Sequence, residues 1–546
     1  MNIRQIGLIV LILPLAGFAQ NPSILINRQG LAQQDLSIRG SSYTGAGISL
    51  NGMNLKVPYS AHYNAEWPLY GPLVSEAQMQ RGLDTVTGGL VGTAAYTTQL
   101  LQPQVISSLG VGTKERYRAT VFGSTENIGG YIDWEKARTI DYDANDLDRL
   151  TGGAFVQFVQ NDWQVDVLGT SQTKQYGAQG YYGIPADVYA EEHTEDGLLF
   201  AGATKGELDG SFIRTGIGLR EFDSEYRIPS SNFTSDVRSR YGSLLIEGRT
   251  IEVQNIALNL RGDLEHDYVS GDIGQHDRTR GSVLILPEAR FERFAIKAGL
   301  NSVFQTDESA EWLPQAGLDF FATDNLTLYA SYAETVQQPD YQTLYYTGPY
   351  RTGNAMLQQQ QAQLSELGLH QFLSARLDWR ASVFQRRQQH AMDWTKATSA
   401  STEWMATDLG TLNVLGADAS LNYRAADDLI LQFYYQWVKK DNYPFYAGLY
   451  ELDYPEQLLG FSGQWQVSRE FLLFAVQNLR YQTDNNVRDD NDFGAEASLG
   501  LHYDPRFAKN VRLSFLVENL WGSNFQAIPG LKPRPASLFT GITVNW

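Results

Sequence analysis

The stretch Asn255–Leu264 reads NIALNLRGDL, and its side chains alternate between two chemical kinds. The apolar positions are Ile256, Leu258, Leu260 and Leu264, and the positions between them are Asn255, Ala257, Asn259, Arg261 and Asp263. A period of two is that of a β-strand, whose successive side chains point to opposite faces. Because one face carries an arginine and an aspartate, the pattern is more typical of a strand between lipid and a wet lumen than of a dry sandwich core.

The same alternation recurs along the chain, in Leu326–Ala333 (LTLYASYA), in Leu429–Trp437 and in the C-terminal Leu538–Trp546. Short turns alternate with mostly long, polar connections, which predicts an all-β protein with about 22 antiparallel strands closed into a transmembrane barrel. The predicted external loops include Gln175–Asp196, Asp223–Ser239, Glu265–Thr279, Val336–Gln360 and Gln389–Thr411. A soluble propeller would require a blade-length repeat, and the sequence shows none.

Composition narrows the classes of function. The chain has 546 residues and a net charge of −19, which argues against nucleic-acid binding because such proteins present a basic surface. There is no cysteine, so disulfides, thiolate metal sites and cysteine nucleophiles are excluded. The histidines form no H-E-x-x-H unit, and no Walker or dinucleotide fingerprint is found in a suitable context. The sequence therefore predicts a protein that is not an enzyme and requires no cofactor.

The N-terminal residues predict export. Residues 1–19 combine an early arginine, a short apolar run and small residues before a cleavage point, which is typical of a secretory signal peptide and too short for a membrane helix. A barrel of about 22 strands encloses more space than its own side chains fill. We therefore expect a plug domain over residues 20–101 inside a barrel over residues 102–546, in the outer membrane of a Gram-negative type of bacterium.

Several short motifs occur in a characteristic order. Asp35–Gly40 reads DLSIRG, Ile48–Gly52 reads ISLNG, Ala61–Leu69 reads AHYNAEWPL and Glu76–Gly82 reads EAQMQRG. Further along, Gln338–Leu369 contains a proline, a Leu-Tyr pair, a Gly-Asn pair and then ELG at the start of a strand. Together these motifs resemble the TonB-dependent outer-membrane receptors, and the resemblance covers nearly the whole mature chain.

The resemblance implies roles for a set of plug residues. These are Ile38, Arg39, Gly40, Asn51, Gly52, His62, Arg81 and Gly82. Arg39 would pair with carboxylates of the barrel wall, because a bidentate arginine–carboxylate pair is a good anchor in a polar lumen. Gly40 and Gly52 would occupy tight turns with positive φ. Trp546 would be the terminal aromatic residue that the barrel-assembly machinery reads during insertion.

The resemblance also implies a function: import of a scarce, bulky nutrient by a monomer in outer-membrane lipid, with the TonB complex as a partner. The segment Gln175–Tyr182 (QYGAQGYY) is most similar to the cobalamin-receptor-like branch, so cobalamin is weakly favoured over a ferric siderophore as ligand. Only Gln20–Ser37 lies between the predicted cleavage point and the IRG motif, and it contains no recognisable TonB box. We therefore expect a shortened plug, and a non-energised surface binding protein derived from such a receptor remains an alternative.

Aromatic residues in the predicted external loops are the best candidates for ligand contacts. They are Tyr176, Tyr181, Tyr182, Tyr341, Tyr345, Tyr346 and Trp394. Tyrosine and tryptophan offer rigid contact area with an apolar body and a polar edge, which suits a small molecule or a metal chelate. The competing interpretation is an interfacial aromatic girdle or packing between loops.

An acidic cluster occupies another predicted external loop, at Asp141, Asp143, Asp146 and Asp148. Calcium prefers carboxylate oxygens of this kind, so a calcium site is a prediction. The spacing lacks the glycine and distal glutamate of an EF-hand, and a solvated acidic loop is the more ordinary interpretation.

Overall fold

The computed structural model describes residues 24–75, 77–80, 89–138, 146–208, 210–306, 308–489 and 491–546. The predicted signal peptide, Arg81, Gly82, Asp141 and Asp143 lie outside these residues. Among the residues that the structure describes, no helix is long and apolar enough to cross a membrane.

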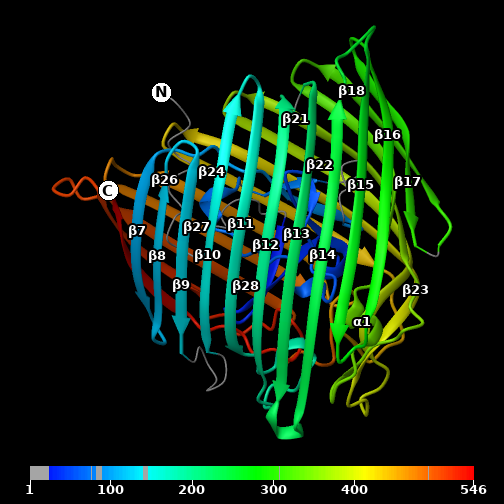
Figure 1. Ribbon diagram of the computed structural model, residues 1–546, viewed down its shortest axis with the longest axis vertical. Helices are drawn as coiled ribbons and strands as arrows, with labels where there is room; N and C mark the ends of the chain where they lie inside the picture. Colours follow the sequence, from blue (N-terminus) through cyan, green and yellow to red (C-terminus); the bar gives the residue numbers. More distant parts are fainter. Residues whose placement is uncertain are drawn as a thin grey trace.

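Most of the described chain forms one closed antiparallel barrel of 22 strands, as predicted (Figure 1). The long strands are β7 (Gln104–Gly112), β8 (Arg116–Ser124), β9 (Ile128–Ala137), β10 (Leu147–Gln160), β11 (Trp163–Gly177), β12 (Glu191–Gly206), β13 (Phe212–Ile228), β14 (Phe233–Arg249), β15 (Ile256–Gly271), β16 (His276–Arg290), β17 (Phe294–Gln305), β18 (Glu311–Thr323), β19 (Leu326–Gln337), β21 (Gln360–Ser374), β22 (Leu377–Lys396), β23 (Trp404–Ala426), β24 (Leu429–Lys440), β26 (Pro455–Gln466), β27 (Phe471–Gln482), β28 (Phe493–Tyr503), β29 (Val511–Glu518) and β30 (Ser537–Asn545). Two-residue pieces, β20 (Arg351–Thr352) and β25 (Ala447–Gly448), add to this sheet from the long connections. β30 pairs with β7, so the ring has no free edge.

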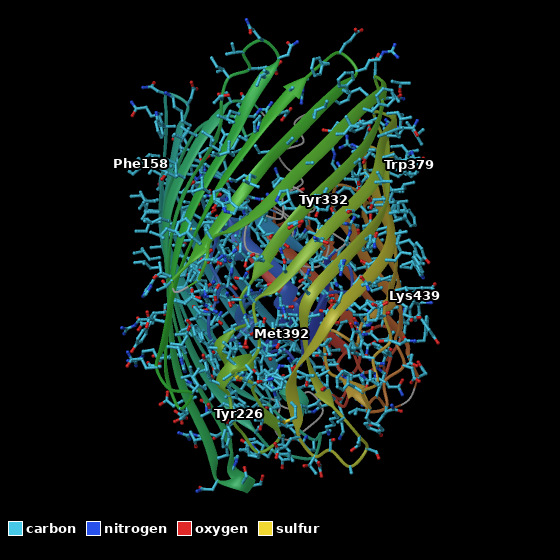
Figure 2. All side chains as sticks on the ribbon, turned by 90° about the vertical axis from the view of Figure 1, so that its right-hand side faces the viewer. Phe158, Tyr226, Tyr332, Trp379, Met392 and Lys439 are labelled. Carbon is cyan, nitrogen blue, oxygen red and sulfur yellow. The ribbon has the colours of Figure 1, made fainter. Side chains whose placement is uncertain are left out.

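The two faces of the wall differ as the alternation predicts. On β15, Ile256, Leu260 and Leu264 are 54%, 42% and 43% exposed on the outside, whereas Arg261 is buried in the lumen. Apolar side chains on the outside and charged ones inside are the arrangement that a lipid bilayer requires. Figure 2 shows side chains projecting from the outer wall, with Phe158 and Trp379 toward the end that carries the short turns. We call this end the turn end and the opposite one the loop end.

Three predicted loops are largely strand, which corrects the sequence interpretation of Asp223–Ser239, Glu265–Thr279 and Gln389–Thr411. β13 and β14 have 17 residues each and are joined only by a 3-10 turn, η8 (Pro229–Ser231). A membrane crossing needs only about 9–11 residues per strand. The hairpin therefore continues beyond the bilayer into water, and Figure 1 shows it projecting past its neighbours. Beyond the lipid the outer face becomes charged, at Glu221, Asp223, Glu225 and Arg227, whereas Phe222, Tyr226 and Ile228 are buried on the inner face. The alternation therefore continues, but the apolar outer face that marks a membrane-crossing strand is missing.

The N-terminal part of the described chain lies inside the barrel and appears in blue in Figure 1. It comprises β1 (Ile24–Gln29), β2 (Gln33–Ile38), η3 (Tyr43–Gly45), β3 (Ala46–Leu50), β4 (Met53–Asn54), η4 (Ala61–Tyr63), η5 (Gly71–Leu73), β5 (Gln78–Gln80) and β6 (Gly92–Tyr96). β1 and β2 form a hairpin, and the other strands form a four-stranded sheet in the order β4-β3-β6-β5. We call residues 24–101 the plug; the exact domain limits remain a prediction. The remaining short elements are η7 (Tyr181–Gly183) and α1 (Tyr341–Tyr345) in the connections at the loop end.

Candidate functional site

Arg39 anchors the plug to the barrel wall. Arg39 and Gly40 follow β2 with φ of 50° and 71°, a left-handed pair that turns the chain sharply and leaves the arginine beside the wall. Its Nη1 and Nη2 donate to the two carboxylate oxygens of Glu366 at 2.8 and 3.0 Å, and its Nε donates to Asp418 at 2.8 Å. The guanidinium also lies 4.1 Å from the ring centre of Phe384. Arg39, Glu366 and Asp418 are all buried, so this contact holds the plug firmly against the wall.

A second plug contact is formed at the turn between β3 and β4. Asn51 and Gly52 have φ of 47° and 79°, and the Asn51 side chain bonds Thr98. The Gly52 carbonyl accepts a hydrogen bond from Arg261 of the wall at 2.8 Å. A Cβ at Gly52 would clash with the guanidinium of Arg214, so only glycine fits this close approach.

Aromatic side chains of the plug face the loop end. The ring of His62, in η4, stacks on Tyr43 with 3.8 Å between ring centres. The Nδ1 atom of His62 lies 2.7 Å from a carboxylate oxygen of Asp35, which fixes the ring. Tyr450, from the connection between β24 and β26, packs edge-on against Tyr43 at 4.8 Å. Plug and barrel connection therefore meet directly at this apex.

Around this contact the plug and the wall bring together buried aromatic and charged side chains. We call them the apical cluster: Tyr43, Tyr59, His62, Tyr63, Tyr176, Tyr182, Glu192, Tyr226, Tyr346, Arg351, Trp394 and Tyr450. Several of their polar atoms have no hydrogen-bond partner within the described part of the chain, namely the hydroxyls of Tyr43, Tyr226 and Tyr450, Nε2 of His62 and Nε of Arg351. Buried polar groups are nearly always paired, so these atoms have hydrogen-bonding capacity for water or for a bound molecule.

Glu192 organises one side of the cluster. Its carboxylate accepts hydrogen bonds from the hydroxyls of Tyr63, of Tyr176 at 2.5 Å, of Tyr182 at 2.7 Å and of Ser224 at 2.7 Å. Burial, reinforced by Glu192, raises the pKa of Tyr63 and of Tyr182 well above the usual value for tyrosine. These hydroxyls therefore stay protonated and act as donors, which holds the three rings in fixed orientations.

Arg351 places a positive charge in the same cluster. It lies on β20, which pairs in parallel with the start of β23 at Trp404. The guanidinium lies 4.0 Å from the ring centre of Trp394 and donates one long hydrogen bond, of 3.4 Å, to Gln342.

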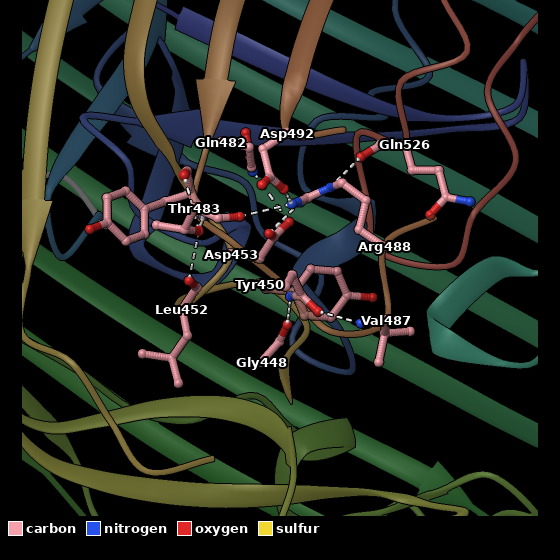
Figure 3. A network of polar contacts seen from close by, with 12 residues as sticks. Gly448, Tyr450, Leu452, Asp453, Gln482, Thr483, Val487, Arg488, Asp492 and Gln526 are labelled. Atoms are coloured by element: carbon pink, nitrogen blue, oxygen red, sulfur yellow. Dashed lines mark hydrogen bonds and ion pairs between the residues drawn. The ribbon is translucent and has the colours of Figure 1, made fainter. Parts of the chain in front are cut away.

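The connections at the loop end are tied to each other and to the plug. Glu451 accepts a hydrogen bond from the backbone N–H of Ser42 in the plug at 2.7 Å, and Lys440 of the wall donates to it at 2.7 Å. Figure 3 shows a second network, in which Arg488 forms an ion pair with Asp453 and donates to the backbone oxygen of Gln526. The connections between β24 and β26, between β27 and β28 and between β29 and β30 are joined in this way.

The comparison with known proteins decides the family. The profile described as "TonB dependent receptor-like, beta-barrel" matches residues 73–520. The chain belongs to the TonB-dependent receptor family. The receptor is therefore an outer-membrane protein, with its turn end in the periplasm and its loop end outside the cell. Membership implies small-molecule ligands and interaction with TonB, and the family consists of receptors and transporters rather than enzymes.

Solved structures give the same fold. The FrpB iron transporter from Neisseria meningitidis (F3-3 variant) superposes with a TM-score of 0.74 at 12% identity, covering 97% of this chain and 96% of that chain. The siderophore receptor PirA from Pseudomonas aeruginosa gives 0.72 at 13% identity, with coverage of 97% and 96%. The ferric enterobactin receptor PfeA from Pseudomonas aeruginosa gives 0.75 at 14% identity, with coverage of 96% and 95%. No curated protein matches the receptor's sequence.

The seven aromatic residues predicted as ligand contacts fall into three sets by their surroundings. Tyr176, Tyr182, Tyr346 and Trp394 belong to the apical cluster. Tyr341 and Tyr345 instead stack on His276, at 5.8 and 3.8 Å, which corresponds to the packing between loops that the sequence left open.

Tyr181 packs against the plug turn at Gly30, and its ring centre lies 5.9 Å from that of Tyr176 and 6.1 Å from that of Tyr182, so it borders the apical cluster. Ligand contact remains a prediction for all seven residues.

The part of the acidic loop that the structure describes shows another use for its carboxylates. Asp148 pairs with Lys136 at 2.9 Å and accepts a hydrogen bond from the Trp134 indole at 3.1 Å. Within the described ranges no group of three or more acidic or histidine side chains is arranged to hold a metal ion. The calcium site, two of whose four residues lie outside those ranges, therefore remains a prediction.

The sequence interpretation missed seven of the twelve residues of the apical cluster: Tyr43, Tyr59, Tyr63, Glu192, Tyr226, Arg351 and Tyr450. Tyr43 and Tyr59 lie close to plug motifs, Tyr63 lies within the motif Ala61–Leu69, and Tyr450 lies in the connection before β26, but none was distinguished from the other tyrosines of the receptor. Arg351 could have been noticed as a lone cation within an aromatic loop sequence.

Proposed function

We propose that the receptor captures a metal chelate or similar small nutrient at the apical cluster and imports it through the barrel with energy supplied by TonB. The observation that carries this proposal is the convergence of the plug apex and the external connections on buried aromatic side chains with unpaired polar atoms. A ligand bound there would contact the plug and the wall at the same time. Binding energy could thereby favour a plug position that differs from the unliganded one.

In the present conformation the ligand would have to displace the external connections. Two cavities border the cluster, of about 60 and about 10 Å³. A ligand pocket for a drug-sized molecule has roughly 300–1,000 Å³, so these cavities accommodate only a few water molecules. Capture therefore requires the connections tied by Glu451 and Arg488 to open, and release to the periplasm requires the Arg39 anchor to move.

Two ligand types remain candidates. The solved neighbours include an iron transporter and receptors for siderophores, which favours a ferric chelate. The resemblance of Gln175–Tyr182 to the cobalamin-receptor-like branch supports cobalamin. The alternative of a non-energised surface binding protein gains no support from the comparisons.

Uptake of labelled ligands tests the proposal. Cells that express the receptor, with and without TonB, are supplied with a radiolabelled ferric siderophore or with labelled cobalamin. We expect accumulation of one of them only when TonB is present, and loss of surface binding when Tyr182 and Trp394 are both replaced by alanine. Binding without accumulation would support the non-energised alternative, and neither binding nor accumulation of any ligand tested would contradict the proposed ligand class.

A further inference from the structure

Arg351 is a buried cation without a carboxylate partner among the residues that the structure describes. Its side chain is 3% exposed, and its one hydrogen bond to a described residue is the long contact with Gln342. The Nε atom has no hydrogen-bond partner in the described part of the chain. The other buried arginines at the plug–wall interface behave differently: Arg220, also 3% exposed, forms an ion pair with Asp196 at 2.7 Å.

Aromatic rings take the place of the missing anion. The guanidinium carbon lies 4.0 Å from the ring centre of Trp394, 5.8 Å from that of Tyr346 and 5.9 Å from that of Tyr182. The negative face of an aromatic ring attracts a cation, but it does not satisfy the N–H donors as an anionic oxygen does. Because the guanidinium of arginine cannot lose its proton in a protein, the positive charge persists despite its burial.

The backbone holds Arg351 in this position. β20 pairs with β23, the Trp404 N–H donates to the Tyr350 carbonyl at 2.8 Å, and the Gly353 N–H donates to the Tyr346 carbonyl at 2.7 Å. The connection thus fixes the residue beneath the external surface. An unpaired buried charge costs stability, so its presence in a well-bonded segment indicates a use other than stability.

We propose that Arg351 anchors an anionic oxygen group of the ligand, so that the receptor selects negatively charged ligands with flat, apolar parts over neutral and cationic ones. This inference rests on the proposed function and adds the charge of the ligand to it. The rings of Tyr346 and Trp394 cover the apolar part, while the unpaired hydroxyls of Tyr43 and Tyr450 supply further donors on the plug side. One bound anion would satisfy donors from the barrel connection and from the plug together.

Binding and stability measurements on the full receptor in detergent test this inference. The probes for calorimetric titration are an anionic ferric catecholate made with 2,3-dihydroxybenzoate, the cationic ferric hydroxamate ferrioxamine B and neutral cyanocobalamin. The variants are Arg351→Met, which removes the charge but keeps much of the length, and Arg351→Lys, which keeps the charge. Arg220→Met is the matched control for thermal unfolding, because it removes an equally buried arginine that does have a carboxylate partner.

We expect the catecholate to bind the parent receptor. Its affinity for Arg351→Met should be at least tenfold lower, and Arg351→Lys should recover part of the lost affinity. We also expect unliganded Arg351→Met to unfold at the same temperature as the parent or higher, while Arg220→Met unfolds at a lower one. Equal binding of the catecholate to Arg351→Met, or preference for the cationic or neutral probe, would overturn the inference. If no probe binds, the proposed function fails for these ligands, but the unfolding temperatures still test whether the charge of Arg351 is unpaired. An unfolding midpoint of Arg351→Met that is lowered as much as that of Arg220→Met would refute an unpaired charge. An unchanged or higher midpoint would support it.

Discussion

Replacing Arg39 by alanine should loosen the plug while leaving the barrel intact. The change removes the cation that Glu366 and Asp418 share, and both carboxylates stay buried in the lumen. Breaking a buried ion pair by removing one partner costs about 3–5 kcal/mol. At roughly 1.4 kcal/mol per tenfold change, this corresponds to about two to four powers of ten in the equilibrium between docked and undocked plug.

Hydrogen exchange resolved by peptide measures that equilibrium directly. Amides of β2 and β3 in the plug should exchange about a hundredfold faster or more in Arg39→Ala, since exchange reports local opening free energies. Barrel peptides should be unchanged. The triple variant Arg39→Ala, Glu366→Gln, Asp418→Asn is the control, because neutral side chains no longer need the cation and should restore much of the protection. Plug peptides that exchange equally in Arg39→Ala and the parent would refute this account of the anchor.

Three further predictions concern other contacts. Arg488→Met should make the external connections cleavable by added protease, because it removes the cation that pairs with the buried Asp453, at a cost of about 3–5 kcal/mol. Arg376→Met breaks the exposed ion pair with Asp427, which is worth at most about 1 kcal/mol, and should leave the connections resistant. Gly52→Ala should lower the unfolding temperature more than Gly410→Ala, because both have positive φ but only Gly52 lies against another side chain; equal effects would show that backbone strain alone matters. Deleting Trp546 should reduce the amount of folded receptor in isolated outer membranes, since its indole donates to Ser107 across the last strand pair; normal amounts would contradict a role in assembly.

The barrel could be predicted from sequence because its physical cause is local. Every membrane-crossing strand has one face in lipid and one in a polar lumen, so a stretch such as Asn255–Leu264 shows both faces within ten positions. The hairpin of β13 and β14 could not be predicted in full, because beyond the bilayer its outer face becomes charged, so the apolar outer face that marks a membrane-crossing strand is missing there. The sequence therefore indicated the crossings and underestimated the strands.

The site was only partly predictable, because its contacts join distant parts of the chain. Arg39 was identified through its motif, and its wall partners Glu366 and Asp418 follow more than 300 positions later. For Arg351 the informative feature is that no described carboxylate forms an ion pair with it, and no pattern in the sequence shows what a side chain lacks. The sequence predicts that the seven aromatic residues lie in the external connections, and the structure places them at the loop end. Which of them contact the plug depends on how the connections fold inward, and this does not follow from the sequence.

The pairing of β30 with β7 has a consequence for the time course of biogenesis. Ser108 and Thr543, which face each other across this pair, are separated by 435 positions. Contacts of such long sequence separation form slowly, because a long chain must be confined before they contribute any stability. Until they form, the partly folded sheet presents two unpaired strands able to associate with other chains. The rate at which β30 pairs with β7, rather than the stability of the closed barrel, therefore sets how long the newly exported polypeptide must be protected from aggregation.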